Sequence, residues 1–234
     1  MSVRVAKFIA DSGVASRRAA EDLISRGAVT VNGRVIDTPV TFVDANDVVA
    51  VNGVTVRPRV DTKLYAFHKP INTMTTAHDT GHRKTIYDVL PPEYQNLKYV
   101  GRLDYKTTGL LLMTNDGELA RRLTLPSSNI PRQYMAMTTK LDERGLERAR
   151  RGITVDGIKY RPMDLEIIDK EKNILRVTVT EGKKNEIRIV LRSCGCPVAK
   201  LHRISFGPVR LGNLSVGKIR EINQKTIDVL LKTL

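Results

Sequence analysis

The sequence is poor in the residues that form disulfides and bind metals. Its 2 cysteines, Cys194 and Cys196, form a C-G-C pair that is too closely spaced for the usual zinc site. The 4 histidines are dispersed, and they neither complete a second ligand cluster nor form an H-E-x-x-H pattern. We therefore expect structural thiols in a reducing compartment and no metal site.

Long apolar runs are also absent. No stretch approaches the roughly 18 residues that span a bilayer, and Asp11 interrupts the N-terminal segment too early for a secretory leader. With 41% hydrophobic and 27% charged residues, the 234-residue chain has an ordinary globular composition. Its length suits a small domain plus a larger one. These features predict a cytoplasmic protein without a membrane partner.

Acidic residues are scarce relative to basic ones. The chain has 39 Lys and Arg against 25 Asp and Glu, a formal net charge of +14. Residues 1–60 hold 8 basic and 6 acidic residues, so the remainder, with 31 and 19, carries most of the excess. Such a balance predicts a polyanionic partner and salt-sensitive binding. A generally basic surface, or attraction to anionic lipid, is the alternative.

Residues 1–60 predict a small module of two short helices and a twisted sheet. An apolar helical face begins at Val5, and Ser16 can cap a second helix. Two Asn-Gly pairs between valine-rich stretches each predict a hairpin turn. The polar segment 57–62 predicts a linker, and residues 61–234 then form a second domain.

The second domain has short strand-like runs with helical patterns placed irregularly between them, which is typical of an α+β fold with a mixed, largely antiparallel sheet. Its central stretch, GRLDYKTTGLLLMTNDG, spans residues 101–117. It places Asp104 on a loop before the apolar run 110–113, which predicts a buried strand. A carboxylate on such a loop suits catalysis. On spacing alone, however, a turn cap or an ion pair with Arg102 is the favoured interpretation.

This stretch resembles the central motif of the pseudouridine synthases that modify ribosomal RNA, specifically the RsuA class. In that family the aspartate of the G-R-L-D element is catalytic, so the resemblance implies this role for Asp104. It implies an isomerase, an intramolecular transferase that moves the glycosidic bond within one uridine. No cofactor is expected, because the substrate already contains every atom of the product. One departure is Lys106, where many relatives carry an acidic or amide residue.

Further motifs follow in the family's order. The Lys-Pro pair at Lys69 resembles the K-P-x-G element that opens the catalytic domain, with Asn72 in place of the glycine. Asparagine tolerates a left-handed backbone better than most residues. Tyr134 matches a strand tyrosine that stacks on the target base, and Arg132 stands in for the basic residue before it. Without the resemblance, core packing is the favoured interpretation of a lone strand tyrosine.

The segment 181–188, EGKKNEIR, resembles the family's E-G-K-x-x-x-V-R element, whose final arginine pairs with the catalytic aspartate. Arg188 occupies that place, and Lys183 and Lys184 are candidate RNA contacts. Leu201 matches an apolar residue that packs against the target nucleotide. The resemblance therefore implies three catalytic residues, Asp104, Tyr134 and Arg188, and three substrate-binding residues, Lys69, Arg102 and Leu201.

The segment 5–36 resembles the S-four-type (alpha-L) RNA-binding fold, in which the basic face of the second helix lies on the phosphate backbone. The resemblance implies that Arg17, Arg18 and Arg26 contact RNA phosphates. A solvated helix face is the alternative for these charges. Phosphate contacts position a protein on RNA but carry little sequence information.

The resemblance implies a specific uridine of ribosomal RNA as substrate, on free RNA or on an assembly particle, with large-subunit RNA favoured. A monomer is the default expectation, since the sequence shows no coiled coil or obvious interface stripe. Asp104 could attack the anomeric carbon as a nucleophile or remove the ribose 2′ proton as a base; both routes stay open. A non-catalytic RNA-binding or ribosome-assembly factor is the second hypothesis, and a transfer-RNA synthase the third.

Overall fold

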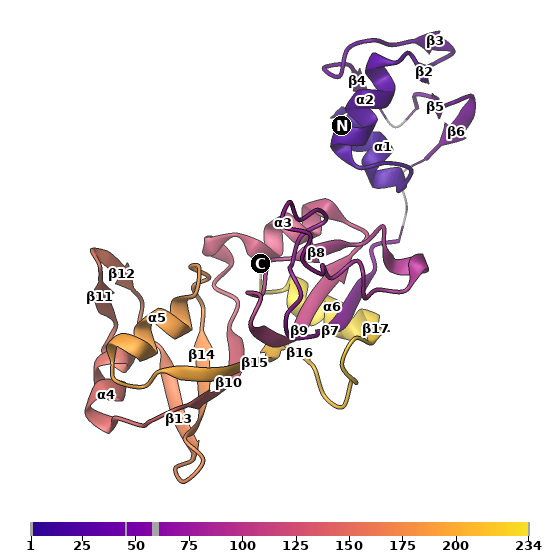
Figure 1. The fold of residues 1–234 in the computed structure, drawn as a ribbon. Helices are drawn as coiled ribbons and strands as arrows, with labels where there is room; N and C mark the ends of the chain where they lie inside the picture. The colour runs from indigo at the N-terminus through magenta and orange to yellow at the C-terminus, as the bar shows by residue number, and fades with distance from the viewer. Residues whose placement is uncertain (1, 45, 58–60, 234) are drawn as a thin grey trace. The chain divides into compact units, whose positions relative to one another are not determined.

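The computed structural model describes residues 2–44, 46–57 and 61–233. It divides into two compact units, Met1–Thr62 with Asn115–Gly117 and Lys63–Thr114 with Glu118–Leu234 (Figure 1). The predicted linker falls partly on residues 58–60, which lie outside the described residues. None of the described helices has the length and apolar character needed to cross a membrane.

The first unit contains the two predicted helices and both Asn-Gly hairpins. Asn32 and Asn52 have φ values of 51° and 50°, the left-handed geometry that such turns require. The Ser16 hydroxyl accepts a hydrogen bond from the Ala19 amide at 3.2 Å and so caps the second helix. The elements are α1 (Val5–Ser12), α2 (Arg17–Ser25), the sheet β3 (Arg34–Val35), β2 (Val29–Val31), β5 (Val49–Val51) and β6 (Val54–Val56), and the pair β1 (Val3–Arg4) and β4 (Phe42–Val43).

The helices of the first unit pack on its small sheet through branched side chains. Ile9 of α1 and Ile24 of α2 are fully buried, as are Val29 and Val49 on the neighbouring strands. These side chains belong to one hydrophobic cluster. Burying such aliphatic side chains stabilises a fold by about 1.5–3 kcal/mol each, which is how a module this small holds a core.

The second unit is built on a 9-stranded sheet. Among the described strands, only the β15–β9 pair runs parallel, so the predicted mixed, largely antiparallel sheet is confirmed. The order is β13 (Asp164–Asp169), β14 (Ile174–Val179), β10 (Arg132–Thr138), β15 (Val198–Phe206), β9 (Thr107–Thr114), β7 (Leu64–Lys69) and β17 (Ile219–Glu221), with β16 (Val209–Arg210) beside β15 and β8 (Lys98–Val100) beside β9.

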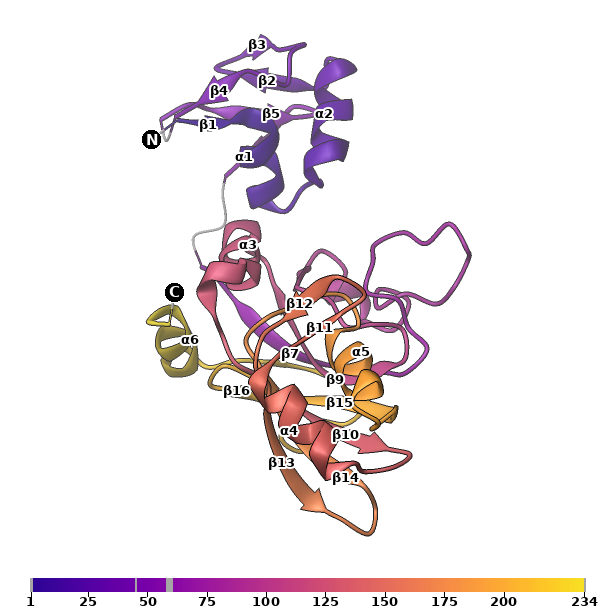
Figure 2. The ribbon, with the colours of Figure 1, turned by 90° about the vertical axis from the view of Figure 1, so that its left-hand side faces the viewer.

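Helices cover both faces of this sheet. Along β9, Leu111 and Met113 point into one hydrophobic cluster, while Leu110 and Leu112 point into another. The first cluster includes residues of α4 (Glu143–Arg151) and α5 (Glu186–Ser193), and the second includes residues of α3 (Gly117–Thr124) and α6 (Gln224–Leu231). In Figure 2, α5 and α6 accordingly lie on opposite sides of the central strands. Two short 3-10 helices, Pro92–Tyr94 and Pro126–Ser128, and a hairpin of β11 (Ile153–Val155) and β12 (Ile158–Tyr160) complete the unit.

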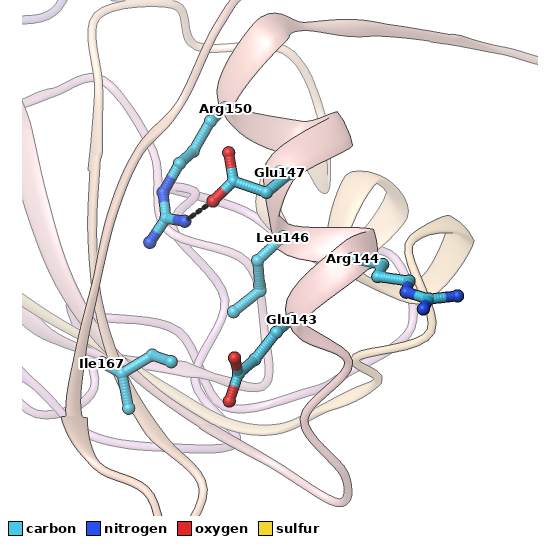
Figure 3. A pocket seen from close by; sticks show the side chains of 6 residues that line it. All are labelled: Glu143, Arg144, Leu146, Glu147, Arg150 and Ile167. Atoms are coloured by element: carbon cyan, nitrogen blue, oxygen red, sulfur yellow. Dashed lines mark hydrogen bonds and ion pairs between the residues drawn. The ribbon is translucent and has the colours of Figure 1, made fainter.

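A hollow of about 230 Å³ lies between α4 and β13 (Figure 3). Three of its charged side chains are engaged with neighbours: Arg150 pairs with Glu147 and donates to the Leu165 carbonyl at 2.6 Å, and Glu143 pairs with Lys170 at 2.5 Å. None of the predicted site residues lines this hollow, so the site has to be sought elsewhere in the unit.

Candidate active site

The predicted catalytic aspartate lies on the segment between β8 and β9, residues 101–106, which we call the Asp104 loop. Asp104 itself is half-buried. Each of the four backbone carbonyls from Leu103 to Lys106 accepts a hydrogen bond from another part of the unit. The pairs are Thr75 Oγ1 to Leu103 O at 2.8 Å, Lys69 Nζ and the Thr107 amide to Asp104 O at 3.3 and 2.9 Å, the Asn72 amide to Tyr105 O at 2.9 Å, and Arg188 Nη2 to Lys106 O at 3.2 Å.

This anchoring fixes the backbone from which the Asp104 carboxylate projects. Thr75 binds Leu103 a second time, because the Leu103 amide donates to its hydroxyl at 3.3 Å, and Thr75 is only 2% exposed. Asn72 has φ 57°, which confirms the left-handed turn expected where the family has glycine. Catalytic groups act best when such contacts hold them in place before the substrate arrives.

Lys69, which the resemblance implies as a substrate-binding residue, lies buried beneath the Asp104 loop. Its side chain is 0% exposed, and its ammonium donates to three carbonyls, those of Pro70 at 3.1 Å, Asp104 at 3.3 Å and Thr107 at 2.9 Å. Burial lowers the pKa of Lys69 to about 8, an effect that the charge of Asp104 partly opposes. All three of its N–H donors are used, so Lys69 anchors the Asp104 loop, and its substrate contact stays a prediction.

Arg188 lies on α5 and joins that helix to the Asp104 loop. Its guanidinium donates to Val198 O at 3.0 Å and to Lys106 O at 3.2 Å, and its Nε is buried without a partner among the described residues. Burial lowers the pKa of Arg188, and the nearby charge of Asp104 partly opposes this. The expected direct pairing is not formed: within the described residues, no ion pair of 4.0 Å or less joins Arg188 to Asp104.

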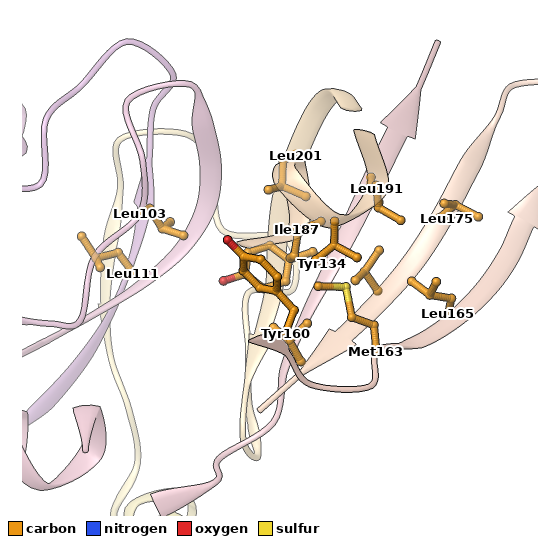
Figure 4. Close-up of a cluster of buried hydrophobic side chains, with 14 of the residues drawn as sticks. Leu103, Leu111, Tyr134, Tyr160, Met163, Leu165, Leu175, Ile187, Leu191 and Leu201 are labelled. Atoms are coloured by element: carbon orange, nitrogen blue, oxygen red, sulfur yellow. The ribbon is translucent and has the colours of Figure 1, made fainter. Parts of the chain in front are cut away.

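Tyr134 and Leu201 lie on adjacent strands beside this loop. In the β10–β15 register Leu201 lies opposite Ala136, two residues from Tyr134, and in the β15–β9 register it lies opposite Thr107. Tyr134 is 8% exposed and Leu201 5%, and both belong to the same cluster. Figure 4 shows the Tyr134 hydroxyl at the edge of the cluster that faces Leu103. The fold thus brings both residues to the Asp104 loop. The Tyr134 ring packs in the hydrophobic core, as expected for a strand tyrosine without a role in stacking.

Sequence reasoning missed a buried arginine beneath the site. Lys69, Gly109, Arg203 and Tyr134 form one row across β7, β9, β15 and β10. Arg203 is 2% exposed, donates from Nε to Leu110 O at 2.6 Å and lies 5.6 Å from the Phe206 ring centroid. The only sequence signal was its place in the basic run after Leu201. Together with Lys69 it puts two cations under the loop that is to meet RNA.

A second group that the sequence did not reveal is Glu186, at the start of α5, the helix that packs against β11. Glu186 is 5% exposed, and burial together with the neighbouring Glu181 raises its pKa to about 7. Despite some burial, a hydrogen bond from Lys183 lowers the pKa of Glu181. Lys183 is exposed, but its ammonium is held by two neighbours. It pairs with Glu181 and donates a hydrogen bond to Lys159 O at 2.6 Å. Lys184 is exposed beside it.

The remaining predicted contacts are exposed. Arg102 lies at the surface of the Asp104 loop. In the first unit Arg17, Arg18 and Arg26, which we call the N-terminal arginine face, are exposed at the two ends of α2. Arg26 pairs with Asp22 at 2.8 Å.

No three His, Cys, Asp or Glu side chains in the described parts of the chain are grouped so that they could hold a metal ion. Cys194 and Cys196 are buried free thiols.

Comparisons with known proteins identify the family of this chain. The RNA pseudouridylate synthase family matches residues 63–193, and the S4 domain matches residues 3–49. The chain therefore belongs to the RNA pseudouridine synthases, a family of isomerases, and carries an N-terminal S4 domain.

Two relatives and one solved structure illustrate the match. An RNA pseudouridine synthase of Aquifex aeolicus is 39% identical over 99% of this chain and 95% of its own length. The ribosomal large subunit pseudouridine synthase B of Bacillus subtilis is 36% identical over 94% of this chain and 91% of its own. A crystal structure of a pseudouridylate synthase superposes with a TM-score of 0.70 at 27% identity, covering 97% of this chain and 99% of that one.

Proposed function

We propose that this protein converts one specific uridine of ribosomal RNA, in the large subunit, to pseudouridine, with Asp104 as the catalytic carboxylate. The observation that carries the proposal is the Asp104 loop, whose four successive carbonyls are all held from outside. The choice of large-subunit RNA is supported by similarity to the Bacillus enzyme, 36% identical over nearly the whole chain.

The reaction requires little beyond a positioned carboxylate. The bond from ribose C1′ to uracil N1 breaks, the base turns, and C1′ bonds to ring carbon C5. The C5 proton then leaves, and N1 gains a proton. Asp104 serves either as the nucleophile at C1′ or as the base that removes the 2′ proton, and each route uses the same carboxylate. No cofactor takes part.

The neighbouring residues receive the roles that the family resemblance implies. Tyr134 stacks on the uracil, Leu201 packs against the target nucleotide, and Arg188 orients the Asp104 loop and adds positive charge beside the carboxylate. Arg102, exposed on the same loop, contacts the substrate RNA. Extruding a base costs a few kcal/mol, which RNA contacts must offset.

Those contacts come from both parts of the chain. The N-terminal arginine face, in a domain of residues 1–60, and Lys183 and Lys184, in a catalytic domain of residues 61–234, bind phosphates. The protein acts as a monomer in the cytoplasm, on free ribosomal RNA or an assembly particle.

The test is pseudouridine mapping of ribosomal and transfer RNA from cells with and without the gene, complemented by wild type or Asp104→Asn. We expect one site in large-subunit RNA to disappear and only wild type to restore it. Loss of a transfer-RNA site instead would redirect the substrate assignment. If every site persists while ribosome assembly is impaired, the RNA-binding assembly factor becomes the better description, because that hypothesis predicts that Asp104 is dispensable.

A further inference from the structure

The two departures from the family's motifs touch each other. Lys106 Nζ donates a hydrogen bond to Asn72 Oδ1 at 3.1 Å, and the same ammonium lies 5.4 Å from the centroid of the Tyr105 ring. Both Asn72 and Lys106 are exposed. Glycine at the first position would have no acceptor, and an acidic side chain at the second would have no ammonium to donate. The contact therefore requires the asparagine, and only the lysine brings a positive charge to it.

The backbones on both sides of this contact are held. The Asn72 amide donates to Tyr105 O at 2.9 Å, and the Lys106 carbonyl accepts from Arg188 Nη2 at 3.2 Å. The left-handed φ of 57° at Asn72 directs the turn that carries its amide side chain. Lys106 is consequently not a free surface lysine, because its stem starts from an anchored loop and its tip is held by Asn72.

We propose that Lys106, held by Asn72 and Tyr105, binds a phosphate of the substrate RNA next to the target uridine. An ammonium has three donors; Asn72 uses one, and the exposed tip leaves two for phosphate oxygens. Lys106 is two positions after Asp104 in the chain, a Cα distance of at most about 7 Å. This places the cation within reach of the phosphates that flank the ribose at Asp104. The proposal rests on the proposed function, since it needs an RNA substrate at that carboxylate.

The effect of Lys106 is measured by RNA binding in an Asp104→Asn background, where no turnover disturbs equilibrium. The probe is a short RNA containing the mapped uridine, titrated at several salt concentrations. Lys106→Gln is expected to weaken binding about 3- to 10-fold and to lower the slope of log K against log salt by about 0.7–0.9, the value for one lost phosphate contact. Asn72→Gly keeps the left-handed turn but removes the acceptor, so it is expected to weaken binding less, in the same direction.

The matched control is Lys225→Gln, an exposed lysine on α6, which packs on the opposite face of the sheet. It is expected to leave the salt slope unchanged. The double variant Lys106→Gln/Asn72→Gly should bind no more weakly than Lys106→Gln alone, because Asn72 acts through the lysine. The proposal is overturned if Lys106→Gln and Lys225→Gln give the same salt slope, or if Lys106→Gln lowers only the melting temperature.

Turnover separates this proposal from the proposed function. In enzyme that keeps the native Asp104, Lys106→Gln is expected to raise KM with kcat nearly unchanged. This is the pattern for a group that binds substrate and transition state equally. If the unaltered enzyme forms no pseudouridine in this RNA, the proposed function fails. If it does form pseudouridine and Lys106→Gln leaves KM unchanged, only the role of Lys106 fails.

Discussion

The Asp104 loop and the N-terminal arginine face hold their charged side chains in opposite ways. The loop is tied at every carbonyl from Leu103 to Lys106, whereas Arg17 and Arg18 are simply exposed on the first turn of α2. Chemistry at one carbon atom needs a carboxylate in a fixed place. A phosphate contact needs mainly a cation of the right sign within reach. Extensive anchoring is therefore a requirement of the chemical step, whereas a phosphate contact is possible with it, as proposed for Lys106, or without it.

The largest expected effect is on the anchored side of the comparison. Asp104→Asn keeps the shape of the side chain but removes the carboxylate, so single-turnover formation of pseudouridine should fall by at least about 10³-fold. RNA affinity should stay within about twofold, because phosphate contacts dominate binding. Quantitative mass spectrometry of the product and a binding titration measure the two quantities. Product formed at the normal rate would contradict a catalytic role.

Gly109→Ala tests the packing beneath the loop. A Cβ at this position would lie 2.3 Å from Arg203 O, and the backbone has φ 104°, which side chains rarely adopt. The expected loss in the free energy of unfolding is about 3 kcal/mol or more. Gly157→Ala is the control: φ is 77°, but nothing lies within 4 Å, so only the backbone strain of about 1 kcal/mol remains. Equal losses in urea denaturation would show that the contact with Arg203 does not matter.

Glu186 is expected to make the stability of the second unit depend on pH. Its folded pKa of about 7 lies above the ordinary 4.5, so between these values the folded protein binds more protons than the unfolded chain. Stability should therefore fall as pH rises from about 4.5 to about 7 and level off above that. Glu186→Gln should remove this slope and exceed wild type in stability at pH 8. Denaturation curves at pH 5 and pH 8 measure it, and a slope that survives in the variant would assign it to another group.

Thr75→Val removes two hydrogen bonds to Leu103 while keeping the side-chain volume. We expect a loss of about 1–2 kcal/mol in stability and a fall in kcat larger than any change in RNA affinity, since the loop loosens where the chemistry occurs. The control Thr178→Val, on β14, replaces a half-buried threonine outside the site. It should change neither the stability nor kcat. An equal fall in kcat for both variants would mean that Thr75 contributes only general stability.

The sequence predicted the locally determined features well. The Asn-Gly turns, the Ser16 cap and the buried strand over residues 110–113 depend on neighbouring residues, and all three are present. The anchoring role of Lys69 could not be predicted, because it depends on a register that brings Thr107 O, 38 residues away, to its ammonium. The same holds for Arg203, because its place between Gly109 and Tyr134 is set by the pairing of β15 with β9 and β10.

The site residues show the same limit. Resemblance singled out Asp104 and Arg188, and the fold brings α5 to the Asp104 loop through Lys106 O. It did not predict that the guanidinium would bind backbone carbonyls in place of the carboxylate. Side-chain contacts across elements depend on angstrom-level packing, which a motif does not encode.

The smallest expected effect tests the exposed side of the comparison. In Arg17→Gln/Arg18→Gln, binding should weaken a few-fold, and the slope of log K against log salt should decrease by about 1.4–1.8, two phosphate contacts' worth. At saturating RNA the double variant should turn over at the wild-type rate, because we expect these cations to bind phosphates away from the reacting nucleotide. Glu21→Gln on the same helix is the control, since it removes an exposed charge of opposite sign. If kcat stayed low at saturation, the arginine face would share the positional demands of the Asp104 loop, and extensive anchoring would no longer be a requirement of the chemical step.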